Sequence, residues 1–311
     1  MNTTRPGMRK DASLARRGRS RRPDSGVSGA VVIDKPTGCT SHDVVDQVRK
    51  ALGTRKVGHA GTLDPDATGV LVLGVGLGTK LLEYTTGSDK TYTGEVVFGT
   101  ETSTLDAAGE VTAVHDMEGL DSGAVKAAAA GFVGDIEQIP PMVSAVKVDG
   151  KRLHELARQG VEVERKARPV TVHRYDVEPT EDPLVYHADV SCSSGTYVRT
   201  LAADLGTALG GGAHLRNLRR TSVGSITIAQ AQSLDDFSLQ PIDLLVRAMP
   251  IIEVDNALAE RVGYGQKLPW GGDSAAAATG RVAIKGPDGT LLAVYEVRHG
   301  QLCPAKVLVG R

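Results

Sequence analysis

The 311 residues of this chain exceed the usual size of one hydrophobic core, and 41% are hydrophobic, so we expect a large domain and a smaller one. The 36 basic and 37 acidic side chains nearly cancel, giving a net charge of −1, which does not by itself indicate a nucleic-acid-binding protein. No run of 18 apolar residues occurs, which disfavours a membrane span, and no apolar segment lies near the N-terminus, which disfavours a secretory signal. The three cysteines are far apart in sequence, which disfavours a disulfide framework and a zinc site and favours a reducing cytoplasm.

Residues 1–28 differ from the rest of the chain in charge. They hold eight basic side chains against two acidic ones and almost no large apolar side chains. Such a composition buries too little surface to offset the entropy of ordering, so it predicts a disordered basic tail. The sequence leaves open whether the tail adds RNA affinity, is a dispensable extension or is a mitochondrial transit peptide.

The ordered chain is expected to begin with a short apolar strand at residues 29–33, which ends in a turn at Asp34, Lys35 and Pro36. Ser41 is the predicted N-cap of a helix that ends at Gly53. One face of that helix carries Val44, Val45, Val48 and Leu52. Lys35 then lies where the strand meets the turn, and a solvated loop lysine is as good an interpretation there as a site residue.

Residues 58–69 (GHAGTLDPDATG) form a polar, glycine-rich loop before an apolar strand that starts at Val70. Pro65 favours an extended backbone at Asp64, and the glycines permit turns that other residues resist. The pattern therefore predicts a shaped loop that presents the Asp64 side chain. An ordinary Asp-Pro turn would explain the dipeptide alone.

The glycines of residues 74–79 (GVGLGT) follow this strand and precede a short helix at residues 80–84. This context is typical of a dinucleotide-binding loop, but Thr79 stands where the last glycine of that motif is needed. We therefore predict a tight connection between strand and helix. Further on, residues 90–98 are expected to form a strand with Tyr92 near its start, and residues 122–132 a helix.

Residues 137–174 are rich in basic side chains and are expected to form an insertion with a hairpin turn at Asp149-Gly150 and a short helix at residues 153–159. RNA affinity without sequence preference comes mainly from phosphate contacts, so this segment is a candidate RNA-gripping flap. A solvated charged face is the alternative. Its candidate phosphate ligands are Lys147, Lys151, Arg152, Arg165, Lys166 and Arg168.

A strand at residues 184–192 leads to a predicted helix capped by Thr196, with Leu201, Leu205 and Leu209 on one face. Arg199 falls in the first turn, where a cation opposes the helix dipole, so we expect an anion nearby. A second basic cluster follows at Arg216, Arg219 and Arg220, which are further candidates for RNA phosphates.

The sequence Ser233-Leu234-Asp235-Asp236 resembles a capping box and predicts the start of a last helical segment before Pro250. From residue 251 to residue 311 the pattern changes to short strands and turns. One turn is expected at Asp288-Gly289, between apolar strands at 282–284 and 291–295. This change marks the predicted boundary of a small C-terminal domain.

Five motifs, taken together and in order, resemble the TruB family of tRNA pseudouridine synthases over roughly residues 29 to 250. They are DKP at 34–36, GHAGTLDPDATG at 58–69, SDKTY at 88–92, QIPPMVSA at 138–145 and GTYVRT at 195–200. The resemblance implies isomerisation of the uridine at position 55 in the T loop of tRNA. It also implies an α+β fold with a mixed, mainly antiparallel sheet in residues 29–250, and a PUA-like RNA-binding barrel in residues 251–311.

The resemblance also implies roles for individual side chains. Asp64 would be the nucleophile, Arg199 would keep it ionised, and Tyr92 would stack on the target uracil. Tyr197 and Leu218 would line the pocket, and Lys35 would lie near it. Because the target base must leave its stack, His59 would insert into the space that the base vacates. The expected partner of this chain, as a monomer, is the T stem-loop of tRNA.

Breaking the bond from C1′ to N1 and rebonding through C5 needs no electron sink, so neither a cofactor nor a metal ion is expected. Attack at uracil C6, attack at C1′ and a glycal route with Asp64 or Tyr92 as base remain open. The leading alternative is a non-catalytic RNA-binding or tRNA-folding protein on the same scaffold. An oxidoreductase is suggested only by the glycines at 74–78, and a metal hydrolase is disfavoured because His42, His59 and Asp64 lack an established ligand spacing.

Overall fold

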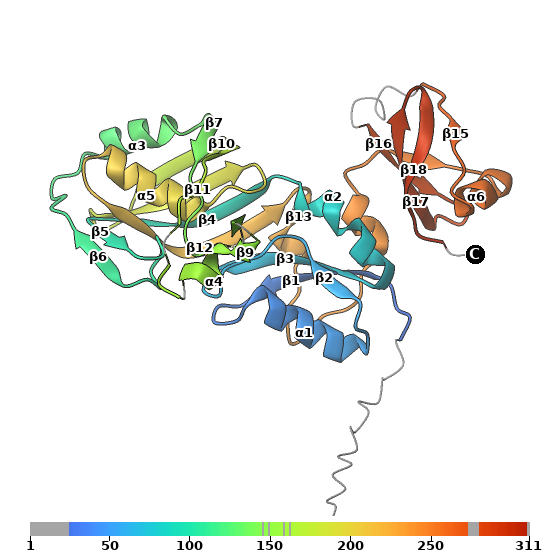
Figure 1. The fold of residues 1–311 in the computed structure, drawn as a ribbon, viewed down its shortest axis with the longest axis horizontal. Helices are drawn as coiled ribbons and strands as arrows, with labels where there is room; N and C mark the ends of the chain where they lie inside the picture. Colours follow the sequence, from blue (N-terminus) through green and yellow to red (C-terminus); the bar gives the residue numbers. More distant parts are fainter. Residues whose placement is uncertain are drawn as a thin grey trace, which may run out of the picture.

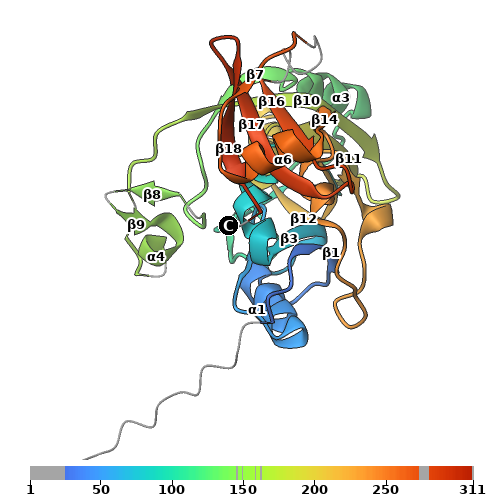
Figure 2. The same ribbon diagram turned by 90° about the vertical axis from the view of Figure 1, so that its right-hand side faces the viewer.

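The computed structural model describes residues 25–144, 146–148, 150–157, 159–161, 163–272 and 280–309. Within that part of the chain, a large body and a smaller β-rich body follow one another along an elongated molecule, and a third, small group of elements projects from the larger body (Figures 1 and 2). Residues 1–24 lie outside the described residues, so the predicted tail stays a prediction.

A mixed sheet, nine-stranded in the described residues, forms the centre of the larger body. Its main path runs β1-β3-β12-β4-β11-β10-β7, while β2 pairs with β3 and β13 with β12. The pairing of β12 with β3 is parallel and the others are antiparallel, which confirms the predicted sheet type. The strands are β1 (Gly29–Lys35), β2 (Val57–His59), β3 (Thr68–Val75), β4 (Lys90–Phe98), β7 (Gly134–Gln138), β10 (Arg168–Pro179), β11 (Val185–Cys192), β12 (Ala213–Val223) and β13 (Ile226–Thr227).

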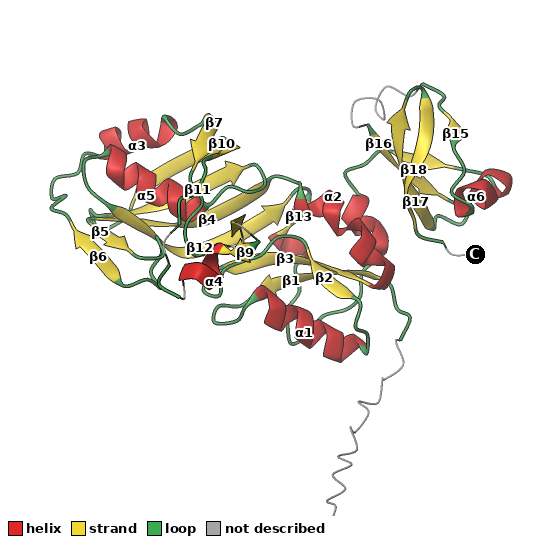
Figure 3. Cartoon of the chain, viewed as in Figure 1, coloured by secondary structure: helices red, strands yellow, loops and turns green. Residues whose placement is uncertain are grey.

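Helices cover two separate parts of this sheet (Figure 3). Helix α1 (Ser41–Leu52) packs its valines on β1, β2 and β3, as its apolar periodicity predicts. Helices α3 (Ser122–Ala130) and α5 (Val198–Ala208) pack over β4, β10, β11 and β12. In the part of the chain that the structure describes, no helix is long and apolar enough to cross a membrane.

Short elements connect these layers. The 3₁₀ helix η1 (Gly76–Leu81) and α2 (Leu82–Thr86) follow β3, and a hairpin of β5 (Thr100–Thr102) and β6 (Val111–Val114) follows β4. The insertion between β7 and β10 carries the paired strands β8 (Lys147–Val148) and β9 (Lys151–Arg152) and helix α4 (Leu153–Ala157). Asp149 of the predicted turn and residue 158 of the predicted helix lie outside the described residues. The side chains of Lys147, Lys151 and Arg152 lie outside the described part of the structure.

Two predicted helix caps are displaced by one residue. Thr40, not Ser41, caps α1, because its hydroxyl accepts from the Asp43 N–H while the Asp43 carboxylate accepts from Thr40. The N-cap of α5 is Tyr197, and the Thr196 hydroxyl instead donates to the Ser193 carbonyl at 3.0 Å.

The predicted helix start at Ser233-Asp236 is wrong. The Ser233 hydroxyl accepts from the Asp235 N–H at 3.2 Å, two residues on, which closes a turn instead of capping a helix. The short 3₁₀ helix η2 (Ile228–Gln230) precedes this segment, and the next helical residues are those of the 3₁₀ helix η3 (Ile242–Val246).

In the residues that the structure describes after 250, the C-terminal body is a curled five-stranded sheet in the order β14-β16-β17-β18-β15 with helix α6 (Asn256–Gly263). The predicted turn at Asp288-Gly289 joins β16 to β17. Lys306 of this sheet pairs with Glu83 of α2 at 2.8 Å, and the Lys80 ammonium donates to the Val307 carbonyl. The strands are β14 (Ile251–Glu253), β15 (Leu268–Pro269), β16 (Arg281–Lys285), β17 (Leu291–Arg298) and β18 (Gln301–Val307).

Gly69 allows β3 to pack between β1 and β12 at the end of the polar loop. It pairs with Lys35 on one side and with Arg220 on the other, with φ at +100°. A Cβ atom on Gly69 would lie 2.2 Å from the Arg220 carbonyl oxygen. Both the backbone angle and the close approach therefore require glycine here.

Replacing Gly69 with alanine is expected to lower the free energy of unfolding by about 3 kcal/mol or more, because strain at positive φ adds to overpacking. Gly119→Ala is the matched control, since Gly119 has φ at +80° but open space around its Cα. The control should cost about 1 kcal/mol. Urea denaturation of both variants measures the difference, and equal losses would contradict the close packing at Gly69.

Candidate active site

Asp64 lies on the loop between β2 and β3, and elements on either side hold that loop in place. The Ser41 hydroxyl, at the start of α1, accepts from the Leu63 N–H at 2.9 Å and donates to the Leu63 carbonyl at 3.1 Å. The Pro65 carbonyl accepts from the Gly38 N–H at 3.0 Å. The residues on both sides of Asp64 are thus fixed, and its carboxylate is presented from a defined backbone.

Two buried cations hold the same loop from within the protein. The Lys35 ammonium donates to the carbonyls of Pro36 and Pro65, both at 2.9 Å. The Arg220 guanidinium donates to Val70 at 2.7 Å, to Gly61 at 3.1 Å and to Thr62 at 3.4 Å. Lys35 is 0% exposed and Arg220 is 1% exposed, so both side chains shape the loop. Neither a solvated Lys35 nor a phosphate contact from Arg220 fits this placement.

Arg199 is the centre of the side-chain contacts around Asp64. From the first turn of α5 its guanidinium reaches the Asp64 carboxylate at 3.2 Å and the Asp106 carboxylate at 3.1 Å. It also donates to the carbonyls of Thr104 at 2.9 Å and Val143 at 3.0 Å. The Arg199 side chain is 5% exposed and that of Asp64 40% exposed. The anion expected from the helix dipole is present, and its carboxylate remains open to a ligand.

Asp106 is a site residue that the sequence did not reveal. It follows Leu105, whose positive φ of 62° is rare for a side chain of this type. The Thr104 hydroxyl and the Ala108 N–H donate to its second carboxylate oxygen at 2.5 and 3.1 Å. In the sequence it is one acid in a loop, without a motif or periodic pattern that would separate it from the others.

The pKa of Asp64 results from opposing effects. Burial raises it above its ordinary value, the Arg199 guanidinium lowers it, and the negative charge of Asp106 raises it again. Burial is the largest of these, so the net direction is upward. Arg199 therefore limits the rise in pKa and does not bring it below the ordinary value, which corrects the expected effect of this pair.

Two cavities meet at the Asp64–Arg199 pair. One, of about 270 Å³, is lined by Tyr92, Tyr197 and Leu218. The other, of about 230 Å³, is lined by Asp106 and Leu218. Asp64 and Arg199 line both. The three residues expected to form a base pocket thus line one cavity beside the acid.

Tyr92 occupies the inner side of the larger cavity. It is 8% exposed and lies on β4, directly opposite Arg220 of β12. Burial raises the pKa of the Tyr92 phenol, so the hydroxyl stays protonated at neutral pH. A protonated phenol is a poor base.

His59 and Lys35 lie outside the residues that line the two cavities. The His59 ring meets His42 edge to face, with ring centroids 5.4 Å apart. Its Nδ1 is buried without a hydrogen-bond partner among the described residues. Burial and the nearby His42 lower the pKa of His59, so its ring is neutral near pH 7.

The remaining basic candidates divide into paired and open side chains. Arg216 pairs with Glu95 at 2.5 Å, and Arg219 pairs with Asp34 at 2.7 Å. In the insertion, Arg165 donates to the Pro140 carbonyl at 3.1 Å, while Lys166 and Arg168 are exposed. The insertion therefore offers more accessible positive charge than the cluster on β12.

The glycines at 74–78 serve close packing. A Cβ atom added to Gly74 would lie 2.5 Å from the Gly78 carbonyl oxygen, and one added to Gly76 would lie 2.2 Å from the Val27 carbonyl oxygen. This is the tight connection that the sequence predicted. Among the described residues, no three His, Cys, Asp or Glu side chains come together in a group that could hold a metal ion.

Comparison with known proteins identifies relatives over most of the chain. Residues 49–198 match the profile described as the N-terminal domain of the TruB family pseudouridylate synthases, and residues 199–243 match a C-terminal domain of tRNA pseudouridylate synthase B. A tRNA pseudouridine synthase B from Arthrobacter sp. (strain FB24) is 45% identical over 90% of this chain and 96% of its own length. One from Thermobifida fusca (strain YX) is also 45% identical, over 91% and 99%.

Solved structures share the fold at lower identity. The chain resembles one in a Cbf5–Nop10–Gar1 complex with a TM-score of 0.69 and 24% identity, over 91% of this chain and 85% of that one. It also resembles one in an H/ACA RNP bound to a substrate RNA containing 2′-deoxyuridine, with a TM-score of 0.68 and 22% identity, over 91% and 86%.

Two substitutions beside Asp64 are expected to move its pKa in opposite directions. Arg199→Gln removes the positive charge and should raise the pKa further, whereas Asp106→Asn removes a like charge and should lower it. Since the carboxylate forms only above its pKa, its charge is lost at a higher pH in the first variant. NMR titration of ¹³C-labelled aspartate measures both shifts, with the exposed Asp116→Asn as control. Shifts of the same sign would contradict this electrostatic arrangement.

Proposed function

Because the chain belongs to the TruB family of pseudouridylate synthases, we propose that it isomerises the uridine at position 55 in the T loop of tRNA. Its class is that of its relatives, a tRNA pseudouridine synthase. The observation that carries the proposal is the Asp64–Arg199 pair at 3.2 Å, where the two cavities meet and beside the pocket that holds Tyr92. A non-catalytic RNA-binding protein would have no need of an acid held in this way.

Asp64 is the proposed nucleophile. Its carboxylate is 40% exposed, so it can reach an atom of the substrate, and the buried guanidinium behind it stabilises the charged form that attack requires. Arg199 is itself held by Asp106, so the cation is fixed before substrate arrives. Such preorganisation means that little reorganisation is needed when charge moves during the reaction.

The uracil is proposed to enter the larger cavity and stack on Tyr92, with Tyr197 and Leu218 as further walls. The base must first leave its stack in the T loop, at a cost of roughly a few kcal/mol. We propose that His59 fills the space left behind. Its neutral ring suits a position between bases, because desolvating an uncharged ring costs less than desolvating an imidazolium.

The raised pKa of Tyr92 bears on the choice of intermediate. A glycal route needs a base, and a phenol whose pKa is raised is less available for this role than a carboxylate. Asp64 therefore remains the proposed reacting group in each of the three routes. Attack at C6, attack at C1′ and the glycal route are all compatible with its position.

Binding of the tRNA is proposed to rest on the insertion between β7 and β10 and on the C-terminal sheet in residues 251–311, as a PUA-like domain. Lys166 is exposed on the insertion, which projects from the body (Figure 2), and Arg168 is exposed at the start of β10, where the insertion returns to the sheet. We further propose that the protein acts as a monomer in the cytoplasm, without a metal ion or cofactor.

Asp64→Asn is expected to reduce pseudouridine formation by a factor on the order of 10⁴ or more, because the amide cannot act as the nucleophile. Binding of tRNA should stay within a few-fold of wild type, since the side chain keeps its size. Tritium release from tRNA with C5-labelled uridine measures the reaction, and mapping of pseudouridine gives the position. Full activity in a preparation free of wild-type enzyme would exclude Asp64 as the nucleophile.

Replacing Arg165, Lys166 and Arg168 together with glutamine is expected to weaken tRNA binding and to reduce the slope of log K against log salt by about 2 to 3. The loss reflects fewer counterions released from phosphates. A triple variant that keeps the charges, Arg165→Lys with Lys166→Arg and Arg168→Lys, is the control and should keep the slope. An unchanged slope in the glutamine variant would show that the insertion does not grip the phosphates.

A further inference from the structure

Gln138 is the last residue of β7, directly before the insertion, and its side chain turns back toward the active site. It is 2% exposed. The carboxamide makes two hydrogen bonds to one residue: its oxygen accepts from the Tyr197 N–H at 2.7 Å, and its nitrogen donates to the Tyr197 carbonyl at 3.1 Å. A side chain with both a donor and an acceptor in one plane is needed for this clamp.

Tyr197 is the residue on which helix α5 starts. Its carbonyl accepts from the N–H groups of Thr200 at 3.1 Å and Leu201 at 3.2 Å, while its own side chain provides no cap. Gln138 bonds to both polar backbone groups of this N-cap residue. The start of α5 is therefore tied to the root of the insertion by a side chain that holds the N-cap residue.

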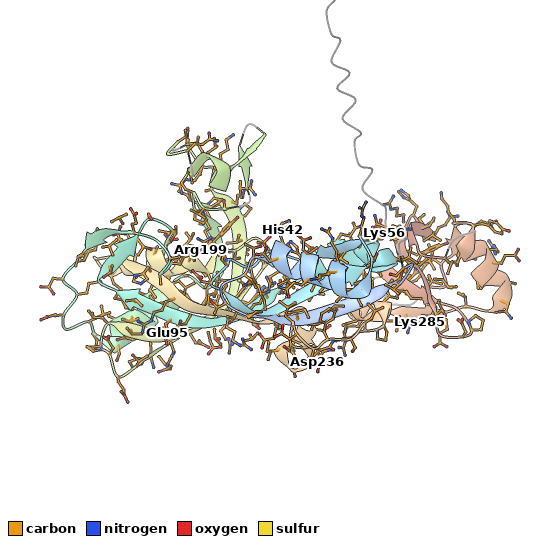
Figure 4. All side chains as sticks on the ribbon, turned by 90° about the horizontal axis from the view of Figure 1, so that it is seen from below. His42, Lys56, Glu95, Arg199, Asp236 and Lys285 are labelled. Atoms are coloured by element: carbon orange, nitrogen blue, oxygen red, sulfur yellow. The ribbon has the colours of Figure 1, made fainter. Side chains whose placement is uncertain are left out.

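The first turn carries Arg199, so the clamp and the catalytic pair share one piece of backbone. Arg199 in turn donates to the carbonyl of Val143, five residues after Gln138. The segment from 138 to 143 is thus attached at both ends to the start of α5. Figure 4 shows Arg199 near the foot of the projecting green segment that this stretch leads into.

The main chain of Gln138 has a separate role. It pairs with Arg168 of β10 in the sheet, which any residue with strand geometry can do. The buried carboxamide adds nothing to that pairing. An apolar side chain of similar size would fill the space and leave the Tyr197 N–H without its partner, which makes the amide chemistry itself the informative feature.

We propose that Gln138 is a positioning residue for the isomerisation, holding Tyr197 and so the first turn of α5 in the place from which Arg199 meets Asp64. This inference rests on the proposed function. It assigns to the first residue of the QIPPMVSA motif a role that acts through Arg199 and requires no contact with RNA.

The test is Gln138→Leu, which keeps the volume and removes both hydrogen bonds. The single-turnover rate of pseudouridine formation should fall about 10- to 100-fold, as for a small misplacement of a reacting group, while the Kd for tRNA stays within about twofold. Gln232→Leu is the matched control. Gln232 clamps Ser238 through the same two backbone hydrogen bonds, in a loop that lines neither cavity, and its loss should leave the rate unchanged.

A pH profile separates positioning from a general loss of stability. The charged groups around Asp64 are Arg199, Lys35, Asp66 and Asp106. If Arg199 withdraws, the acid limb of the profile moves to higher pH, whereas a smaller folded fraction lowers the whole profile without moving it. Gln138→Met also removes both hydrogen bonds but keeps an unbranched, uncharged side chain of similar length, so it should show the same loss of rate, and it decides the matter if the leucine variant does not fold.

A double variant closes the test. If Gln138 acts through Arg199, Gln138→Leu should have little further effect in an Arg199→Lys background, where the pair is already impaired. The proposal would be overturned if the fold losses in rate of the two single variants multiplied in the double variant. It would also be overturned if folded Gln138→Leu kept the wild-type rate and the wild-type acid limb. An inactive wild-type enzyme would instead contradict the proposed function, so the two failures are distinguishable.

Discussion

The site depends on one requirement, that a buried guanidinium must have all its partners in place. Removing a cation from water is costly unless carboxylates and carbonyls surround it. Arg199 meets this requirement with groups from three segments besides its own helix, namely Asp64, the loop of Thr104 and Asp106, and Val143. Assembling that shell brings the loop, the hairpin region and the root of the insertion to the start of α5, and the two cavities form around it.

A second set of buried cations shapes the polar loop. Lys35 and Arg220 bond to backbone carbonyls, so they fix where the chain runs without competing for the Asp64 carboxylate. Arg220, a candidate phosphate ligand in the sequence, and Lys35, expected near the pocket, thus both support the backbone that presents the acid. This arrangement lets a loop with few regular hydrogen bonds of its own hold one side chain in a fixed position.

Burial raises the pKa of both Asp64 and Tyr92, but the consequences for the two side chains differ. It raises the pKa of Asp64, which would leave less carboxylate at neutral pH, and Arg199 counters this effect. It also raises the pKa of Tyr92, which keeps the phenol protonated. Burial of this region therefore keeps the tyrosine neutral, while the acid beside it needs a guanidinium to favour its charged form.

Local patterns in the sequence determined a strand starting at residue 29, which continues two residues beyond the predicted end, and the strand at 90–98. They also determined the valine face of α1, the exposed bend at Asp64 and an anion near Arg199, because period, turn chemistry and the helix dipole act over a few residues. Only the tertiary structure decided that Arg199 also binds Asp106, 93 positions away, that Arg220 bonds to Gly61, 159 positions away, and that Gln138 holds Tyr197, 59 positions away. Such partners meet through the packing of distant strands. The residues next to a side chain in the sequence do not indicate which buried carbonyl or carboxylate that side chain will contact.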